Sequence, residues 1–177
     1  MYHSFSLIAS QSGARILPKP LMFQKLIQYL ESLKNPTCRL VRLNPDATLP
    51  AMATQLAAGY DLTSVDAVCL EPQQRCLVHT GIRASIPAGY HMEIRPRSGL
   101  ALKHGVTVLN SPGTIDADYR GEIMVLLINL GDKPYAIAVG DRIAQIVMMR
   151  HSSVHFEWAE SLDKTDRDVN GFGSTGD

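Results

Sequence analysis

Ile123-Met-Val-Leu-Leu-Ile-Asn129 and Ile143-Ala-Gln-Ile-Val-Met-Met149 are the segments that decide the fold of this 177-residue chain. Both are near-continuous apolar runs, and we expect them to form strands that are buried on both faces. Turn signals lie around them, at Ser111-Pro112-Gly113, Leu130-Gly131-Asp132 and Gly140-Asp141. The two runs therefore predict strands separated by turns.

Three further segments extend the strand pattern. Cys38–Leu43 and Gln74–His79 are short and rich in β-forming residues, and Tyr90–Arg95 alternates apolar and polar residues as a half-buried strand does. Only Ser98–His104 resembles a helical turn in this region. Short strands without crossover helices favour an all-β sandwich or barrel over a parallel α/β sheet. We place this barrel at residues 38–158.

The first 37 residues form a separate N-terminal extension. Apolar positions in residues 21–34 follow helical spacing and predict an amphipathic helix, which Asn35-Pro36 ends. The extension is interpreted as a packing helix or a poorly ordered segment. Its serine-rich, acid-poor start also loosely resembles an organellar transit peptide.

Composition excludes several classes of protein. The chain has 17 basic and 17 acidic side chains, so a nucleic-acid partner, which usually requires a basic face, is not expected. No apolar run reaches transmembrane length, so we expect a soluble protein without a membrane partner. The three cysteines have no CxxC spacing, which fits a reducing compartment and predicts a cytoplasmic location.

The last residues, 159–177, are predicted to be a flexible tether that ends in a glycine-rich arm. Glycines let backbone N–H groups cradle an anion, hydroxyl and guanidinium groups bind phosphate, and an aromatic ring on a mobile arm can stack on a base. The arm therefore suggests a nucleotide, through Arg167, Phe172, Gly173, Ser174 and Thr175.

Arg97, Ser98 and Gly99 open the predicted helical turn. Unpaired N–H groups at a helix start favour phosphate, and Arg97 adds positive charge. The alternative is that Ser98 is a plain N-cap. A nucleophilic serine is not expected, because Pro96 and Leu100 break the G-x-S-x-G pattern.

Asp116 and Asp118 would face the same side if their segment were extended. One carboxylate could then act as a general base on water while the other organises the site. The alternative is a solvated turn. Further along the chain, Gln145 is a strand amide that could donate to phosphate, and Asp141-Arg142 is most simply an ion pair at a strand start.

His151 and His155 are spaced as a zinc-binding pair on a helix would be. Their strand-like context gives them no shared helical face, and no glutamate of a zinc-protease pattern lies between them. A zinc site made by this pair is therefore not expected.

Five segments of the chain, in this order, resemble the five motifs of the trimeric deoxyuridine triphosphatase (dUTPase) family. The resemblance covers residues from about 38 to the end. Its motifs are Ala58–Leu62, Pro96-Arg-Ser-Gly-Leu-Ala101, Ile115-Asp-Ala-Asp-Tyr-Arg-Gly121, Gly140-Asp-Arg-Ile-Ala-Gln145 and Gly171-Phe-Gly-Ser-Thr-Gly176.

The resemblance implies a jelly-roll β-barrel that assembles as a homotrimer with active sites at subunit interfaces. It implies Mg²⁺-dependent cleavage of dUTP to dUMP and pyrophosphate, which lowers dUTP and supplies dUMP for thymidylate synthesis. The expected partners are therefore dUTP, dUMP and other copies of the chain.

The resemblance also implies a role for each matching residue. Asp116 corresponds to the base that activates water for attack on the α-phosphorus. Tyr119 corresponds to the residue packed under deoxyribose, and Asn110 to a uracil reader in a hairpin too tight for a 5-methyl group. Asp61 corresponds to the acid associated with the metal's water shell.

Phosphate contacts are implied for Arg97, Ser98, Gly99 and Gln145. The arm residues, Arg167, Phe172, Gly173, Ser174 and Thr175, would close over the nucleotide of a neighbouring subunit.

The arm departs from the family pattern at two positions where glycine is usual, Asp168 and Asn170. Asn tolerates positive φ, Asp does so less well, and Asp168 adds negative charge near the triphosphate. We therefore expect weaker arm closure with the chemistry retained. Two other functions stay open: a dCTP deaminase of the same fold, which could be bifunctional, and a nucleotide-gated protein-binding module.

Overall fold

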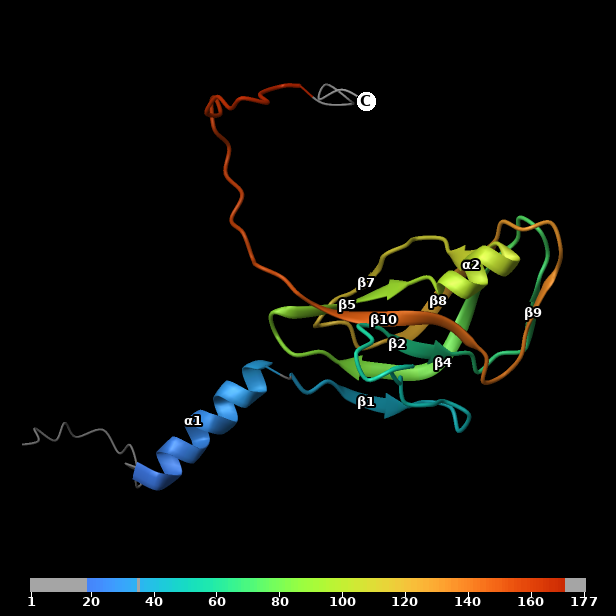
Figure 1. The fold of residues 1–177 in the computed structure, drawn as a ribbon, viewed down its shortest axis with the longest axis horizontal. Coiled ribbons are helices and arrows are strands. Elements are labelled where there is room, and N and C mark those ends of the chain that lie inside the picture. The colour runs from blue at the N-terminus through green and yellow to red at the C-terminus, as the bar shows by residue number, and fades with distance from the viewer. Residues whose placement is uncertain (1–18, 35, 171–177) are drawn as a thin grey trace, which may run out of the picture.

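The structure is a computed structural model that describes residues 19–34 and 36–170 (Figure 1). Two helices and ten strands make up its regular structure. In chain order they are α1 (Lys19–Lys34), β1 (Arg39–Arg42), β2 (Tyr60–Thr63), β3 (Val68–Leu70), β4 (Arg75–Ser85), β5 (Tyr90–Arg95), α2 (Ser98–His104), β6 (Val106–Val108), β7 (Gly113–Ile115), β8 (Glu122–Asn129), β9 (Tyr135–Ile137) and β10 (Arg142–Arg150).

The strands form two four-stranded antiparallel sheets and one two-stranded ribbon. One sheet has the order β1-β4-β8-β6 and the other β2-β10-β5-β7, while β3 pairs with β9. The all-β prediction is confirmed, and the predicted helical turn is α2. Strands β2, β3, β6, β7 and β9 have only three or four residues, too few to show a period in the sequence.

The hydrophobic core lies between the inner faces of the sheets. On β8 the inward side chains of Ile123, Val125 and Leu127 are fully buried, whereas the alternate ones are half-buried. The expectation that this apolar run is buried on both faces is therefore wrong for a single chain. An antiparallel sheet covers only one face with its own core, so the outer apolar face of β8 stays open to another molecule.

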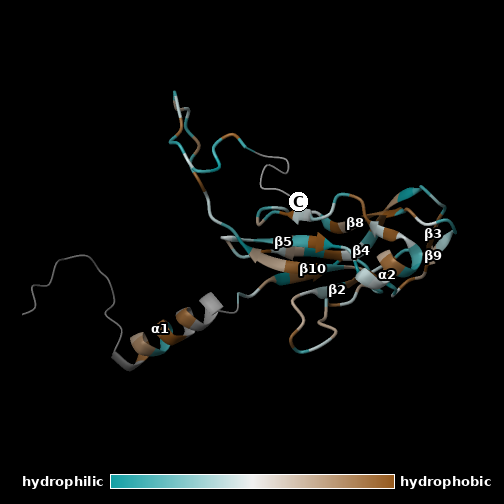
Figure 2. Ribbon diagram, turned by 45° about the horizontal axis from the view of Figure 1, so that its top comes forward, coloured by the Kyte–Doolittle hydropathy of each residue, from teal (hydrophilic) through white to brown (hydrophobic). Residues whose placement is uncertain are grey.

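Helix α1, which includes the predicted segment 21–34, is not covered by the barrel. Its apolar residues run along the helix in Figure 2 and are exposed at Leu21, Met22, Phe23, Leu26, Ile27 and Leu30. Neither described helix is long and apolar enough to span a membrane.

The C-terminal segment 151–170 leaves the barrel without forming a helix or strand (Figure 1), and all its residues are exposed. The last barrel strand ends at Arg150, before the expected boundary at residue 158. The exposed segment includes the large apolar side chains of Val154, Phe156 and Trp158.

The buried side-chain amide of Asn129 connects the β3–β9 ribbon to the β1-β4-β8-β6 sheet. Asn129, at the end of β8, is fully buried and donates from Nδ2 to the carbonyls of Leu70 (2.9 Å) and Lys133 (2.8 Å). Its Oδ1 accepts from the N–H of Gly131 at 2.9 Å. Three backbone groups, one buried and two partly buried, therefore depend on one side chain.

Replacing Asn129 with alanine should lower the free energy of unfolding by about 2–4 kcal/mol, because buried backbone groups lose their partners. Chemical denaturation at neutral pH measures this loss. Asp132→Ala, in the same turn but exposed, is the control and should stay within about 0.5 kcal/mol of wild type. Equal stability of Asn129→Ala and Asp132→Ala would contradict this role for Asn129.

Candidate active site

Helix α2 begins at the end of β5 and presents its first turn to solvent. Its N-cap is Arg97, with extended backbone angles and no capping side chain, so the interpretation of Ser98 as N-cap is wrong. Ser98 and Gly99 are exposed, and a Cβ at Gly99 would meet nothing within 4 Å. The first-turn N–H groups of a helix lack intrahelical acceptors. An open, donor-rich surface therefore lies at Ser98 and Gly99.

The carboxylate of Asp61 holds two arginines beside this turn. Oδ1 accepts from Nε of Arg97 at 3.1 Å, and Oδ2 accepts from Nη1 of Arg142 at 3.0 Å. Arg97 Nη1 also donates to the backbone carbonyl of Arg142 at 2.9 Å. The Asp61 side chain is only 17% exposed, so its bonds to the two cations are partly shielded from solvent.

The prediction that Asp141 and Arg142 form an ion pair is wrong. Asp141 Oδ2 instead accepts from the backbone N–H of Ala138 at 2.8 Å, which closes the turn before β10. The guanidinium of Arg142 instead bonds to Asp61, which is 81 residues away in sequence but lies on β2, the neighbour of β10 in the sheet. Sequence reasoning missed Arg142 as a site residue because a neighbouring acid supplied a simpler partner.

Gln145 is fixed between two strands. Its Nε2 donates to the carbonyl of Pro96 at 3.0 Å, and its side chain fills the space beside Gly59. A Cβ at Gly59 would collide with the Gln145 amide. One N–H of the Gln145 amide is used by Pro96, and the other is left for a ligand.

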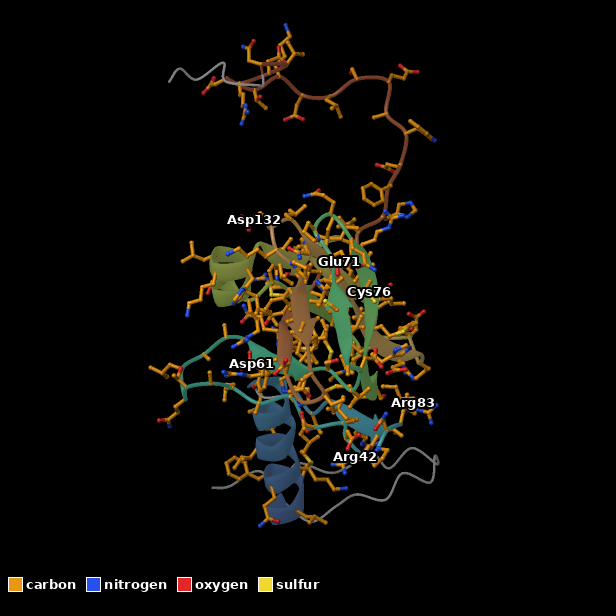
Figure 3. All side chains as sticks on the ribbon, turned by 90° about the vertical axis from the view of Figure 1, so that its right-hand side faces the viewer. Arg42, Asp61, Glu71, Cys76, Arg83 and Asp132 are labelled. Carbon is orange, nitrogen blue, oxygen red and sulfur yellow. The ribbon has the colours of Figure 1, made fainter. Side chains whose placement is uncertain are left out.

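Strand β10 is what brings these residues together. In the sheet register Gln145 lies opposite both Asp61 on β2 and Arg95 on β5. Arg97 follows Arg95 by two residues, so the predicted residues Asp61, Arg97 and Gln145 meet at one end of this sheet. Figure 3 labels Asp61 on the same side of the barrel as α2.

Asn110 lies in the four-residue connection between β6 and β7, and Gly113 begins β7. These two strands belong to different sheets, so the predicted hairpin is instead a tight crossing from one sheet to the other. Gly113 is buried, and a Cβ there would approach Asn110 Nδ2 to 3.2 Å and Ile94 Cβ to 3.5 Å, so glycine lets the Asn110 side chain lie against the start of β7. Asn110 itself is exposed and accessible to a ligand.

Asp116 and Asp118 do not lie on an extended segment. β7 ends at Ile115, and the N–H of Tyr119 bonds to the carbonyl of Asp116 at 3.2 Å, which makes a turn. The prediction that Asp116 and Asp118 face the same side, which required an extended segment, is therefore wrong. Asp116 is exposed, and its carboxylate has no hydrogen-bond or ion-pair partner among the described residues.

Tyr119 closes this turn. Its hydroxyl donates to the carbonyl of Glu122 at 3.0 Å, and a Cβ at Gly121 would collide with its ring. Tyr119 is 41% exposed, so a ligand can reach part of it. Arg120 Nη1 caps the same turn through the carbonyls of Ala117 (2.7 Å) and Tyr119 (2.8 Å).

Within one chain, the predicted residues form two groups at opposite ends of a sheet. Ile115 on β7 pairs with Met92 on β5, so Asp116 follows at the level of His91, while Arg97 lies past the other end of β5. Six residues of extended chain span about 20 Å. Asp116 and Arg97 of the same chain are therefore too far apart to act on one phosphate.

The arm is described only up to residue 170. Arg167 Nε donates to the carbonyl of Asn170 at 3.0 Å, and Asp168 adopts a positive φ of 44°. The backbone thus takes the left-handed conformation at a position where the family usually has glycine. Phe172, Gly173, Ser174 and Thr175 lie outside the described residues.

Comparison with known proteins decides the family. The profile of the family described as dUTPase matches residues 45–176. The chain belongs to the dUTPase family. A deoxyuridine 5'-triphosphate nucleotidohydrolase from Wolinella succinogenes is 52% identical over 83% of this chain and 99% of its own length. One from a Hydrogenobaculum strain is 57% identical over 76% and 94%.

Solved dUTPase structures agree with the fold. A variant of the Staphylococcus bacteriophage 80alpha dUTPase with dUpNHpp has a TM-score of 0.75 and 27% identity over 80% of this chain and 99% of that one. A phage phi11 dUTPase variant, described with a structural Mg(II) ion, has a TM-score of 0.66 and 26% identity over 71% and 97%. The predicted jelly-roll-like β fold of the dUTPases is confirmed.

Replacing Gly59 with alanine should lower the free energy of unfolding by about 1 kcal/mol, because the new Cβ displaces the flexible Gln145 amide and breaks its hydrogen bond to the Pro96 carbonyl. Thermal unfolding measures the change. Gly99→Ala is the matched control, since its Cβ enters open space in a helix, and stability should be unchanged or up to about 1 kcal/mol higher. The account of Gln145 fails if both alanine variants behave alike.

Proposed function

We propose that this protein is a dUTP pyrophosphatase that hydrolyses dUTP to dUMP and pyrophosphate. The observation that carries this proposal is the cluster of Asp61, Arg97 and Gln145 in a chain that belongs to the dUTPase family. Relatives that share about half of its residues are named deoxyuridine 5'-triphosphate nucleotidohydrolases, which favours this reaction over the dCTP deaminase and the binding module.

Arg97, Ser98, Gly99 and Gln145 bind the phosphates in this proposal. A guanidinium, free helix N–H groups and an amide N–H converge on the open surface at the start of α2. Donors that are already fixed lose little freedom when charge develops on the phosphate oxygens, so they stabilise the transition state. Asp61 positions Arg97 through its hydrogen bond.

Asp116 is the proposed general base. Its carboxylate is exposed and unpaired in the described chain, so it is available to take a proton from water that attacks the α-phosphorus. Attack there forms the new P–O bond of dUMP while pyrophosphate leaves. Asn110 and the tight β6–β7 connection read uracil, and the exposed Tyr119 packs under deoxyribose.

Mg²⁺ fits this site through the substrate. Among the described residues no three His, Cys, Asp or Glu side chains are grouped as a metal cage, and both oxygens of Asp61 already bind arginine. Mg²⁺ typically keeps several waters and binds substrate phosphates, where it neutralises charge. Asp61 would meet the ion only through water.

A homotrimer brings the two halves of the site together. Asp116 and Arg97 lie at opposite ends of a sheet, about 20 Å apart, so a complete site needs Asp116 of one subunit beside Arg97 of another. The exposed side chains of Val154, Phe156 and Trp158 alternate with polar residues, as a strand added to a neighbour would. Residues 151–177 would then carry the arm to another subunit's nucleotide.

An apolar groove of about 630 Å³ supports such an addition. It lies between β1 and the β2-β10-β5 sheet and is lined by Leu40, Tyr60, Tyr90, Met92, Ile146 and Met148, among others. A single chain leaves this surface uncovered, and a second copy can cover it with the apolar side chains of its own C-terminal segment.

A pyrophosphate-release assay with dUTP, dTTP, dCTP and UTP tests the proposed function. We expect rapid Mg²⁺-dependent release from dUTP alone, because the tight β6–β7 connection rejects a 5-methyl group and Tyr119 rejects a 2′-hydroxyl. Binding of dUTP without pyrophosphate release would favour the binding module, and ammonia from dCTP would favour the deaminase.

Asp116→Asn should lower kcat for dUTP by about two to four orders of magnitude, the usual contribution of a positioned base. Binding of dUpNHpp should be largely retained, since the amide keeps the shape of the carboxylate. Asp118→Asn, two residues away and also exposed, is the control and should keep most activity. Equal turnover in wild type and Asp116→Asn would remove Asp116 from its role.

Asp168→Gly should raise kcat/KM for dUTP by about fivefold. Glycine adopts the positive φ without the steric cost of about 1 kcal/mol that aspartate has there. The change also removes a negative charge near the triphosphate. Asp166→Gly removes the same charge in the same segment, where the backbone has no positive φ, and so isolates the backbone effect. If both variants gain equally, charge and not backbone conformation limits the arm.

A further inference from the structure

Two histidines face each other where the C-terminal segment leaves the barrel. His91 lies on β5, and His151 follows directly after β10, where its N–H donates to the carbonyl of Gly89 at 3.1 Å. The two Nδ1 atoms are 3.3 Å apart, and the ring centroids are 5.4 Å apart with a tilt of 47°. The backbone of each histidine is held by hydrogen bonds, and this places the two imidazole rings side by side.

A carboxylate supports one of these rings from behind. His91 Nε2 lies 3.5 Å from Glu93 Oε1, and Glu93 is held in turn by Arg95, whose Nε donates to Oε2 at 2.9 Å. The side chains of His91 and Glu93 are only 19% and 18% exposed. When Nε2–H of His91 donates to the carboxylate, His91 Nδ1 accepts the hydrogen bond from His151 Nδ1–H, and the same lone pair can bind a metal ion once the His151 proton moves to its Nε2.

The spacing of the two Nδ1 atoms matches the bite of a tetrahedral metal ion. Zinc binds imidazole nitrogen at about 2.0–2.1 Å, so two nitrogens at the tetrahedral angle lie about 3.3–3.4 Å apart. The observed separation is 3.3 Å. A carboxylate that accepts from the other ring nitrogen is the usual outer support of a metal-binding histidine.

We propose that His91 and His151 form a binding site for a divalent transition-metal ion, Zn²⁺ in the first place. Two imidazole nitrogens come from the protein, and water completes the coordination shell, because no cluster of three such ligands occurs in the described part of the chain. Imidazole ligands suit Zn²⁺, Ni²⁺ and Cu²⁺ and not Mg²⁺, which requires oxygen. The site is therefore chemically distinct from the Mg²⁺ that accompanies nucleotide.

The bound ion would tie the first residue of the C-terminal segment to β5. His151 begins the segment that continues to Arg167 and the arm, and its side chain is exposed, whereas His91 belongs to a strand paired on both sides. The site thus anchors the start of this segment to the barrel. His155, four residues further along, is not part of the site.

Titration of the tag-free, full-length protein with ZnCl₂ tests the proposal, in buffer free of nucleotide and Mg²⁺. We expect one Zn²⁺ per chain by calorimetry, with affinity reduced at least tenfold in His91→Gln and in His151→Gln. Glu93→Gln should weaken binding about 10-fold while keeping both ligands. Cu²⁺ in place of Zn²⁺ should give an electron paramagnetic resonance spectrum with hyperfine coupling to two nitrogens.

His155→Gln is the matched control, because it removes an exposed histidine from the same segment. It should leave the Zn²⁺ affinity and the Cu²⁺ spectrum unchanged. Circular dichroism of each variant verifies that the fold is intact. The proposal is overturned if wild type binds no Zn²⁺, or if His91→Gln and His151→Gln bind it as tightly as His155→Gln does.

Discussion

The Asp61 carboxylate is the interaction on which the rest of the site depends. It bridges Arg97 at the start of α2 and Arg142 at the start of β10, and so connects three segments that are far apart in sequence. The antiparallel pairing of β10 with β2 and β5 makes this possible, since it sets Gln145 level with both neighbours. Substitution at any of these positions should therefore disturb the whole surface that we propose binds phosphate.

The barrel also holds Asp116 and Arg97 of one chain far apart. The same β5 that leads to Arg97 pairs with β7, whose far end leads to Asp116. Because β5 and β7 pair in one sheet, the proposed base Asp116 and the residues proposed to bind phosphate lie at opposite ends of that sheet in one chain. In this account a complete active site therefore forms only when chains assemble. The chains would contact one another through the open apolar surfaces of β8, the groove and residues 151–158.

The sequence predicts the long strands well, because apolar periodicity is a local property, and it selects candidate site residues from the order of the motifs, whose individual roles stay predictions. Prediction from sequence fails where a side-chain contact or a backbone turn depends on residues that are distant in sequence. Arg142 pairs with Asp61 and not with its neighbour Asp141, and the segment from Asp116 to Tyr119 turns instead of extending. The meeting of His91 with His151 is likewise set by strand register, which no local pattern reveals.

The position of water attack is the most direct test of the account, since it depends on the base and the phosphate-binding residues acting on the same α-phosphorus. Hydrolysis of dUTP in ¹⁸O-labelled water, followed by mass spectrometry of both products, locates the new bond. The account predicts the label in dUMP and none in pyrophosphate. Label in pyrophosphate would place the attack on the β-phosphorus and contradict the proposed roles of Asp116 and Arg97.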